Sequence, residues 1–276
     1  MASEQHFSAS ASVSRQATSY GYTDFDLSSV FPNNTAKPIK ADFYVHVHRD
    51  YYFLLSPTAT ARIEYNGVNK CSVSSNKEAG TDKTETGDTA AEITGHAKGD
   101  TSARIGTVSS FGGCTARAEG TITLYFTRYD FAANGSTGVT ASVDRPTGYD
   151  GDTIIFTATV QNGYAFDGWY DGASKVSGDL VYQHTVSGGD LSLTAKAVPT
   201  TKTITIQYNG TMIATETGVP PFAIAYNGET IASVGSGETK TLQCGGKVMR
   251  GNVTVGGKTL TCDGKVMNGN IAVSVS

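Results

Sequence analysis

Alternating apolar and polar residues mark short strands along the first half of the chain. A period of two runs through HFSASASV at residues 6–13, ADFYVHVHRD at 41–50 and ATARIEYNG at 59–67. Successive side chains of a strand point to opposite faces of its sheet, so each run presents one face to a core and the other to water or a neighbouring subunit. No segment shows the helical period over a length typical of a helix. Residues 1–131 are therefore predicted to form a β-sandwich-like domain.

A polar stretch interrupts this pattern. Residues 74–92, SSNKEAGTDKTETGDTAAE, carry charge, glycine and threonine without apolar periodicity, which predicts a long exposed loop that becomes ordered on assembly. Two further strands, GTVSSF at 106–111 and EGTITLYFTRY at 119–129, close the domain. The small residues of DFAANGSTG at 130–138 then predict a linker and the first domain boundary.

A second block of short strands covers residues 139–198, and in its middle stands GYAFDGWYDG at 163–172. The glycines and aromatic residues of this motif, together with the closing strand LSLTAKAV at 191–198, resemble the Listeria–Bacteroides repeat, the divergent internalin-B-type B-repeat. The resemblance implies a small β-grasp-like or Ig-like module. Such modules serve as spacers or adhesive units in extracellular bacterial and phage proteins, and the resemblance implies no enzyme activity.

The aromatic residues of this motif have two possible roles. A domain of about 60 residues needs large apolar side chains to bury enough area, which favours Phe166 and Trp169 as core anchors. The alternative is an exposed aromatic platform that contacts sugar. The candidate glycan-contact residues of that platform are Tyr164, Trp169 and Tyr170.

After a second linker, VPTT at 198–201, the chain repeats itself every eighteen residues. Four units that align without a gap begin at residues 203, 221, 239 and 257. Each has a strand ending in tyrosine or cysteine, followed by Asn-Gly, Gly-Gly or Asp-Gly, the dipeptides of a type I′ hairpin turn. Because one hairpin alone is unstable in water, neighbouring units are expected to cover one another's apolar faces. Residues 203–276 are thus predicted to be a repeat domain of four hairpins.

Part of this domain has a second resemblance. Residues 225–249 read AYNGETIASVGSGETKTLQCGGKVM. They resemble C-terminal repeats of structural proteins from phages that infect Firmicutes and related gut bacteria. The resemblance implies a recurring terminal segment of such proteins, without an assigned activity.

Composition agrees with an all-β chain of three domains, at 1–131, 139–198 and 203–276. Hydrophobic residues make up 38% and charged residues 17% of the 276 positions, and 32 are glycine, as expected for short strands joined by tight turns. The net charge of −4 provides no basic surface for phosphates, so nucleic acid is not an expected partner. No apolar run reaches the roughly 18 residues of a membrane span, and the N-terminus lacks an export signal, so membrane insertion and Sec export are not expected.

The residues that most often carry chemistry form no recognisable constellation. No nucleophile with its base, carboxylate pair or phosphate-binding loop is apparent, so neither an enzyme nor a cofactor is expected. His46, His48 and Asp50 share a strand face and could ligate a metal if a trimer brought three sets together. The favoured alternative is a polar surface facing solvent or a subunit, without a metal.

The four cysteines lack the close spacing of a zinc site. We expect them to pack as small apolar side chains. A disulfide between the last two remains open. They are Cys71, Cys114, Cys244 and Cys262.

Together these features favour a non-enzymatic structural protein of a phage virion. Residues 1–131 are expected to dock onto other virion proteins and to form a homo-oligomer, with a trimer as the expected state. The smaller domains then project from the virion surface and contact a glycan or protein of the host, where many copies multiply a modest affinity. A tail fibre or baseplate position is favoured over capsid decoration or a head fibre. The alternatives are a bacterial cell-surface adhesin and, less favoured, a carbohydrate-active enzyme with its carboxylates in the first domain.

Overall fold

The computed structural model describes the chain except residues 1, 51–55, 209–210, 219–220, 227–228, 235–238, 244–246, 249–251, 256–257, 262–265, 268–269 and 276. Its described part is almost entirely β, which confirms the predicted all-β, multi-module fold. The exceptions are one helical turn, α1 (Ala91–Thr94), and a 3-10 turn, η1 (Lys98–Asp100). The chain divides into two compact units, residues 1–132 with 143–156 and 183–192, and residues 133–142 with 157–182 and 193–276.

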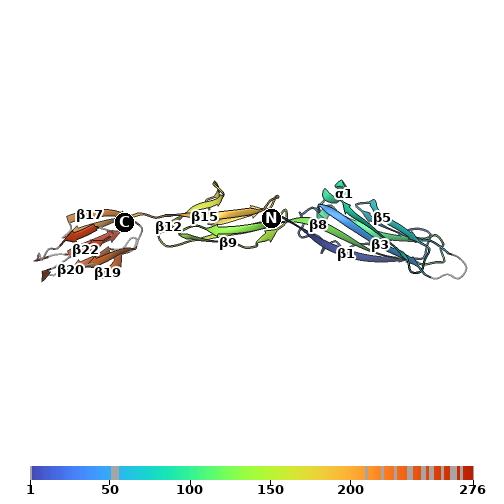
Figure 1. The fold of residues 1–276 in the computed structure, drawn as a ribbon, viewed down its shortest axis with the longest axis horizontal. Coiled ribbons are helices and arrows are strands. Elements are labelled where there is room, and N and C mark those ends of the chain that lie inside the picture. The colour runs from blue at the N-terminus through green and yellow to red at the C-terminus, as the bar shows by residue number, and fades with distance from the viewer. Residues whose placement is uncertain are drawn as a thin grey trace. The chain divides into compact units, whose positions relative to one another are not determined.

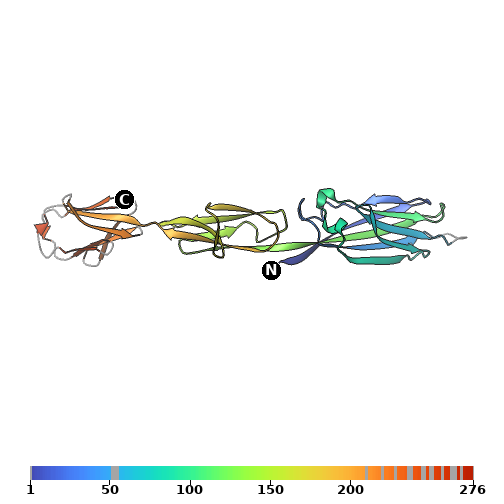
Figure 2. The same ribbon diagram turned by 90° about the horizontal axis from the view of Figure 1, so that it is seen from above.

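Four strands of a larger sheet and a separate four-stranded sheet face each other in the N-terminal domain (Figures 1 and 2). The first sheet has the order β1-β8-β3-β6 and the second β2-β7-β4-β5. Neighbouring strands pair antiparallel in both sheets. Their bounds are β1 (Ser3–Arg15), β2 (Gly21–Asp24), β3 (Lys40–Arg49), β4 (Ala59–Tyr65), β5 (Val68–Ser75), β6 (Thr81–Asp88), β7 (Ala103–Ser109) and β8 (Ala116–Gly135).

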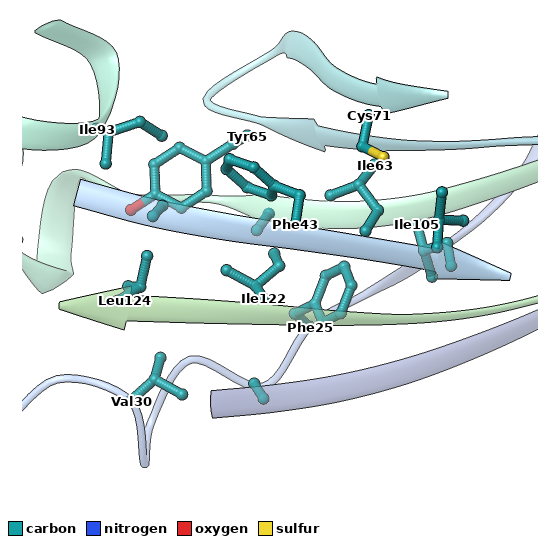
Figure 3. Packing of buried hydrophobic residues seen from close by; sticks show 14 of the residues in the cluster. Phe25, Val30, Phe43, Ile63, Tyr65, Cys71, Ile93, Ile105, Ile122 and Leu124 are labelled. Carbon is teal, nitrogen blue, oxygen red and sulfur yellow. The ribbon is translucent and has the colours of Figure 1, made fainter. Parts of the chain in front are cut away.

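The core between these sheets is built from the apolar positions of the alternating pattern. Phe43 and Tyr65 meet edge to face with ring centroids 5.9 Å apart, and Ile122 and Leu124 of β8 lie beside them (Figure 3). All four side chains are fully buried. The period of two in β3 is thus explained by burial of every second residue, and the β-sandwich prediction holds for this domain.

The predicted loop at residues 74–92 is wrong over its middle part. Residues Thr81–Asp88 form strand β6, whose backbone pairs with β3 from Ala41 to Val47. The side chains of β6 are largely exposed because it lies at the edge of the sheet. Backbone hydrogen bonds therefore hold this strand without an apolar pattern, and charges on an edge strand discourage pairing with other chains.

The predicted linker at residues 130–138 is also wrong over most of its length. Strand β8 continues to Gly135 without interruption. Phe131 is 4% exposed, and its amide donates to the carbonyl of Pro146 at 2.8 Å. The amide of Asp130 donates to Oδ1 of Asp190 at 3.0 Å. Small residues here fit close strand packing, which the sequence pattern does not distinguish from a flexible linker.

The segment from Val139 to Pro199 contains seven strands and no helix. Of the two folds expected for this module, the Ig-like one therefore fits better than the β-grasp. In this segment β12 pairs with β13 and β15, and β9, β11 and β14 form another sheet. The bounds are β9 (Val139–Val143), β10 (Thr147–Gly148), β11 (Thr153–Val160), β12 (Tyr164–Asp171), β13 (Ser174–Ser177), β14 (Val181–Thr185) and β15 (Leu191–Pro199).

The repeat domain consists of two four-stranded sheets, β17-β16-β25-β20 and β19-β18-β22-β23, and a short pair, β21 with β24. Buried residues of the two larger sheets include Ile204, Phe222, Ile224, Val234, Ile271 and Val273. The bounds are β16 (Lys202–Tyr208), β17 (Thr211–Gly218), β18 (Phe222–Tyr226), β19 (Glu229–Val234), β20 (Thr239–Gln243), β21 (Lys247–Val248), β22 (Asn252–Val255), β23 (Lys258–Thr261), β24 (Val266–Met267) and β25 (Asn270–Val275).

The prediction of four separate hairpins is correct for only two units. The first and second units form the hairpins β16–β17 and β18–β19. In the described part of the third and fourth units, strands pair across the unit boundary instead: β20 with β25, β21 with β24, and β22 with β23. The predicted turn residues of all four units, at 209–210, 227–228, 245–246 and 263–264, lie outside the described residues, as do Cys244 and Cys262.

The eighteen-residue repeat produces a two-fold relation between the two larger sheets. Ile206 pairs with Val273 in one sheet, and Ile224 pairs with Val255 in the other. Ile224 lies one repeat after its equivalent Ile206, and Val255 lies one repeat before its equivalent Val273. Val248 pairs directly with its own equivalent, Val266. The repeated sequence therefore encodes two equivalent halves whose strands are interchanged.

Candidate functional site

The predicted aromatic platform lies on strand β12. A register shift between Phe166 and Gly168 interrupts its pairing with β15. Gly168 has φ of +151°, and a Cβ there would lie 2.6 Å from the carbonyl oxygen of Ser177. This position therefore requires glycine, and the bulge determines which side chains of β12 share a face.

Trp169 points into the core of the module. Its side chain is 0% exposed, and its ring packs edge to face on Phe166 with centroids 6.2 Å apart. Because no part of the indole is accessible, Trp169 does not belong to a glycan-contact surface. Its position agrees with the alternative prediction of a core anchor.

The two tyrosines lie on opposite faces of the sheet. Residues directly opposite in an antiparallel pair share a face, and Tyr164 pairs with Pro199 whereas Tyr170 pairs with Thr194. Pro199 and Thr194 differ by an odd number of positions on β15, so they point to opposite sides. The structure thus does not bring Tyr164, Trp169 and Tyr170 together. The bulge, which is hard to recognise in a sequence, is the reason.

Tyr170 lies on the face away from Trp169. Its hydroxyl donates to Oδ2 of Asp167 at 2.8 Å, and Nζ of Lys196 lies 3.9 Å from the ring centroid. The hydrogen bond to Asp167 raises the pKa of Tyr170 above its ordinary value. Of the predicted platform, Tyr170 therefore remains a candidate contact residue, with Asp167 and Lys196 beside it.

Two of the candidate metal ligands in and directly after β3, His46 and Asp50, have charged protein partners. Nδ1 of His46 contacts Oδ1 of Asp82, and Nε of Arg117 lies 3.0 Å from Oδ1 of Asp50. The hydrogen bond from Arg117 lowers the pKa of Asp50. The rings of His46 and His48 are 5.6 Å apart. Within the described residues no group of three or more His, Cys, Asp or Glu side chains is arranged to hold a metal ion.

The outward face of the first sheet carries a continuous polar surface that the sequence pattern indicated only as solvent- or subunit-facing. Cross-strand rows on β1, β8 and β3 place Ser10 beside Thr121, and Ser12 beside Glu119. Tyr44 continues the first row, and His46 the second. The side chain of Tyr44 is 38% exposed. A shallow hollow of about 330 Å³ lies over these rows.

A second polar cluster, on the other sheet, was not anticipated from the sequence. Glu64 of β4 has a side chain only 7% exposed, and it binds Arg62 at 2.6 Å and Arg104 at 2.6 Å. The hydroxyl of Tyr22 donates to Oε1 of Glu64 at 3.0 Å. Gly106 lies under the Tyr22 ring, where a Cβ would approach to 2.5 Å. The strand pattern alone does not indicate that these residues converge.

The two cysteines in the described part, Cys71 and Cys114, are free and 2% exposed. Burial raises the pKa of the Cys71 thiol. Both fit the predicted role of small buried side chains. None of the helices in the described part of the chain has the length and hydropathy needed to cross a lipid bilayer.

These features define an all-β chain of several modules with polar and aromatic surface patches. Residues 129–200 match the family model of the divergent InlB B-repeat domain, which confirms the B-repeat prediction for this segment. The chain therefore contains a surface-associated, adhesin-like β module. Searches of curated proteins and of solved structures gave no match.

Proposed function

We propose that this chain is a non-enzymatic structural protein of a bacteriophage virion that attaches the particle to the host surface. The observation that carries the proposal is the B-repeat match at residues 129–200, an adhesin-like module placed between two other β-rich segments. The resemblance of residues 225–249 to repeats of phage structural proteins supports the virion setting. A tail fibre or baseplate position is favoured over capsid decoration or a head fibre.

In this proposal the N-terminal sandwich docks onto other virion proteins and forms a homo-oligomer, with a trimer as the expected state. The module and repeat domain are displayed at the virion surface and contact a glycan or protein of the host. The partly exposed Tyr170 beside Lys196 is a suitable contact on the module. Display in many copies makes weak single contacts sufficient.

Electron microscopy of purified particles with an antibody against residues 1–131 tests the virion setting. Label at the tail or head supports the proposal. Complete particles that carry all other structural proteins but no label contradict it. The same antibody applied to uninfected cells tests the second candidate, a bacterial surface adhesin, with which the B-repeat match is also compatible. Light scattering of the full chain tests oligomerisation, since monomeric behaviour is incompatible with the expected trimer.

A further inference from the structure

The polar outward face of β1, β8 and β3 contains a groove, and the proposed docking role gives this groove no function. On β1 every side chain of this face between Ser8 and Ser14 is a serine. The neighbouring positions on β8 and β3 carry larger groups, among them Glu119, Arg117 and Tyr44. The step in height between short and long side chains leaves a groove that follows β8.

Two adjoining hollows make up this groove. The first, of about 330 Å³, lies between Tyr44, Glu119 and the hydroxyls of Ser10 and Thr121. The second, of about 150 Å³, lies between Ser12, Glu119 and the side chains of His48 and Arg117. Ser12 and Glu119 line both, so the hollows are continuous at the centre of the sheet face.

The wall of the groove is held in place by neighbouring side chains. Asp82 contacts Nδ1 of His46, and burial together with the charge of Asp82 raises the pKa of the Tyr44 hydroxyl. The Oγ of Ser10 and Oγ1 of Thr121 are 2.9 Å apart. A ligand therefore meets an aromatic ring and a hydroxyl surface that are already positioned, which lowers the entropy cost of binding.

The charges around the groove restrict the class of ligand. Arg117 is paired with Asp50, whereas Glu119 forms no ion pair with any described residue. An unpaired carboxylate at the centre disfavours phosphate and other anions. The hydroxyl and carboxylate lining disfavours an apolar ligand, because its burial would leave these polar groups without partners. A neutral ligand rich in hydroxyl groups satisfies both restrictions.

We propose that this groove binds a neutral glycan chain. The ring of Tyr44 packs against one face of a sugar, the carboxylate of Glu119 accepts hydrogen bonds from sugar hydroxyls, and Ser12 and Thr121 exchange hydrogen bonds with others. The proposal rests on the proposed function of host attachment and adds the ligand class. It also adds a glycan contact on the N-terminal sandwich to the Tyr170 contact proposed for the module, leaving the remaining surface of the sandwich for docking.

The test measures retention of the full chain on immobilised chitosan, which is cationic, and on four neutral polysaccharides: cellulose, chitin, mannan and β-1,3-glucan. At least one of these four is expected to retain the wild-type chain. Ser12→Trp fills the groove and Tyr44→Ala removes the ring, and each is expected to weaken retention about tenfold or more. Ser8→Trp, on the same strand face but outside both hollows, is the matched control and should bind as wild type. Circular dichroism confirms that all variants are folded.

Three outcomes overturn the inference. These are retention by none of the polysaccharides, equal retention of Ser12→Trp and wild type, and binding only to a cationic polysaccharide such as chitosan. Binding of the full chain to host cells is measured separately. Cell binding that survives Ser12→Trp and Tyr44→Ala removes this inference while leaving the proposed function intact. Groove-dependent polysaccharide binding without any binding to cells removes the proposed function instead.

Discussion

Asn33 donates a hydrogen bond from Nδ2 to Oδ1 of Asp152 at 2.8 Å, across 119 positions of the chain. The same amide nitrogen donates to the carbonyl of Asp150 at 3.1 Å. Its Oδ1 accepts from the amides of Thr35 and Ala36 at 2.9 and 2.6 Å. One side chain thus connects a loop of the N-terminal sandwich to the loop that follows β10, within a single compact unit.

Replacement of this side chain should loosen that connection. We expect Asn33→Ala to lower the free energy of unfolding by about 1–3 kcal/mol, because several partly buried groups lose their partners at once. Amide hydrogen exchange should become faster in residues 149–152. The slowly exchanging amides of the sandwich core should be unaffected. Asn34→Ala is the control, since Asn34 is exposed. Equal effects of the two substitutions would show that the hydrogen bonds of Asn33 are unimportant.

The close approach at Gly151 gives a second prediction. Gly151 has φ of +85°, and a Cβ there would lie 1.6 Å from Oγ1 of Thr35. We expect Gly151→Ala to destabilise the protein by more than about 2 kcal/mol, from backbone strain and steric overlap together. Thermal unfolding measures this change.

Two variants separate the causes. Gly178→Ala, at a position with open space and no positive φ, should change stability little. In a Thr35→Gly background, Gly151→Ala should cost less than it does in the wild type, because the overlapping side chain is gone while the strain remains. An equal cost in both backgrounds would mean that the strain accounts for the whole effect.

Glu64 should make stability depend on pH. Burial raises its pKa, but hydrogen bonds from Arg104 and Tyr22, with the charges of Arg62 and Arg104, outweigh burial and hold the pKa below its ordinary value of 4.5. A carboxyl with a lowered folded pKa contributes stability above its unfolded pKa. That contribution is lost as the pH falls through the folded pKa.

We therefore expect Glu64→Gln to cost about 2 kcal/mol at neutral pH and progressively less in acid. Urea unfolding of both proteins between pH 7 and pH 3 measures the difference. Glu78→Gln, at an exposed position of the same domain, should show no such trend. If the difference in the free energy of unfolding between wild type and Glu64→Gln is constant over this pH range, the role given to the Glu64 carboxylate is contradicted.

The sequence was sufficient where burial alone determines the pattern. In β3 the buried side chains of Phe43 and Val45 alternate with the exposed ring of Tyr44, so the strand and its faces could be predicted. It was insufficient where backbone pairing holds a polar strand, as in β6, or where a bulge changes the face, as between Phe166 and Gly168. Neither feature leaves a periodic signal in a single sequence.

The candidate surfaces show the same division. Each groove residue lies at a position whose outward direction follows from alternation, but the meeting of Ser12, Glu119 and His46 in one row depends on the order β1-β8-β3. The cluster around Glu64 likewise requires β2, β7 and β4 to be neighbours. Strand order is set by the whole sandwich, so these surfaces could not be derived from local pattern.

The interchanged strands of the repeat domain lead to the last prediction. β25 lies between β16 and β20 in one sheet, and β23 is the edge of the other. Deletion of residues 257–276 removes both strands, so each sheet loses pairing although only the fourth unit is gone. We expect amide protection to fall in residues 204–206, which lose β25, and in 252–255, which lose β23, while the N-terminal sandwich, as internal control, keeps its protection. Four independent hairpins would behave differently, since the first two would stay protected, and that result would refute the two-fold arrangement.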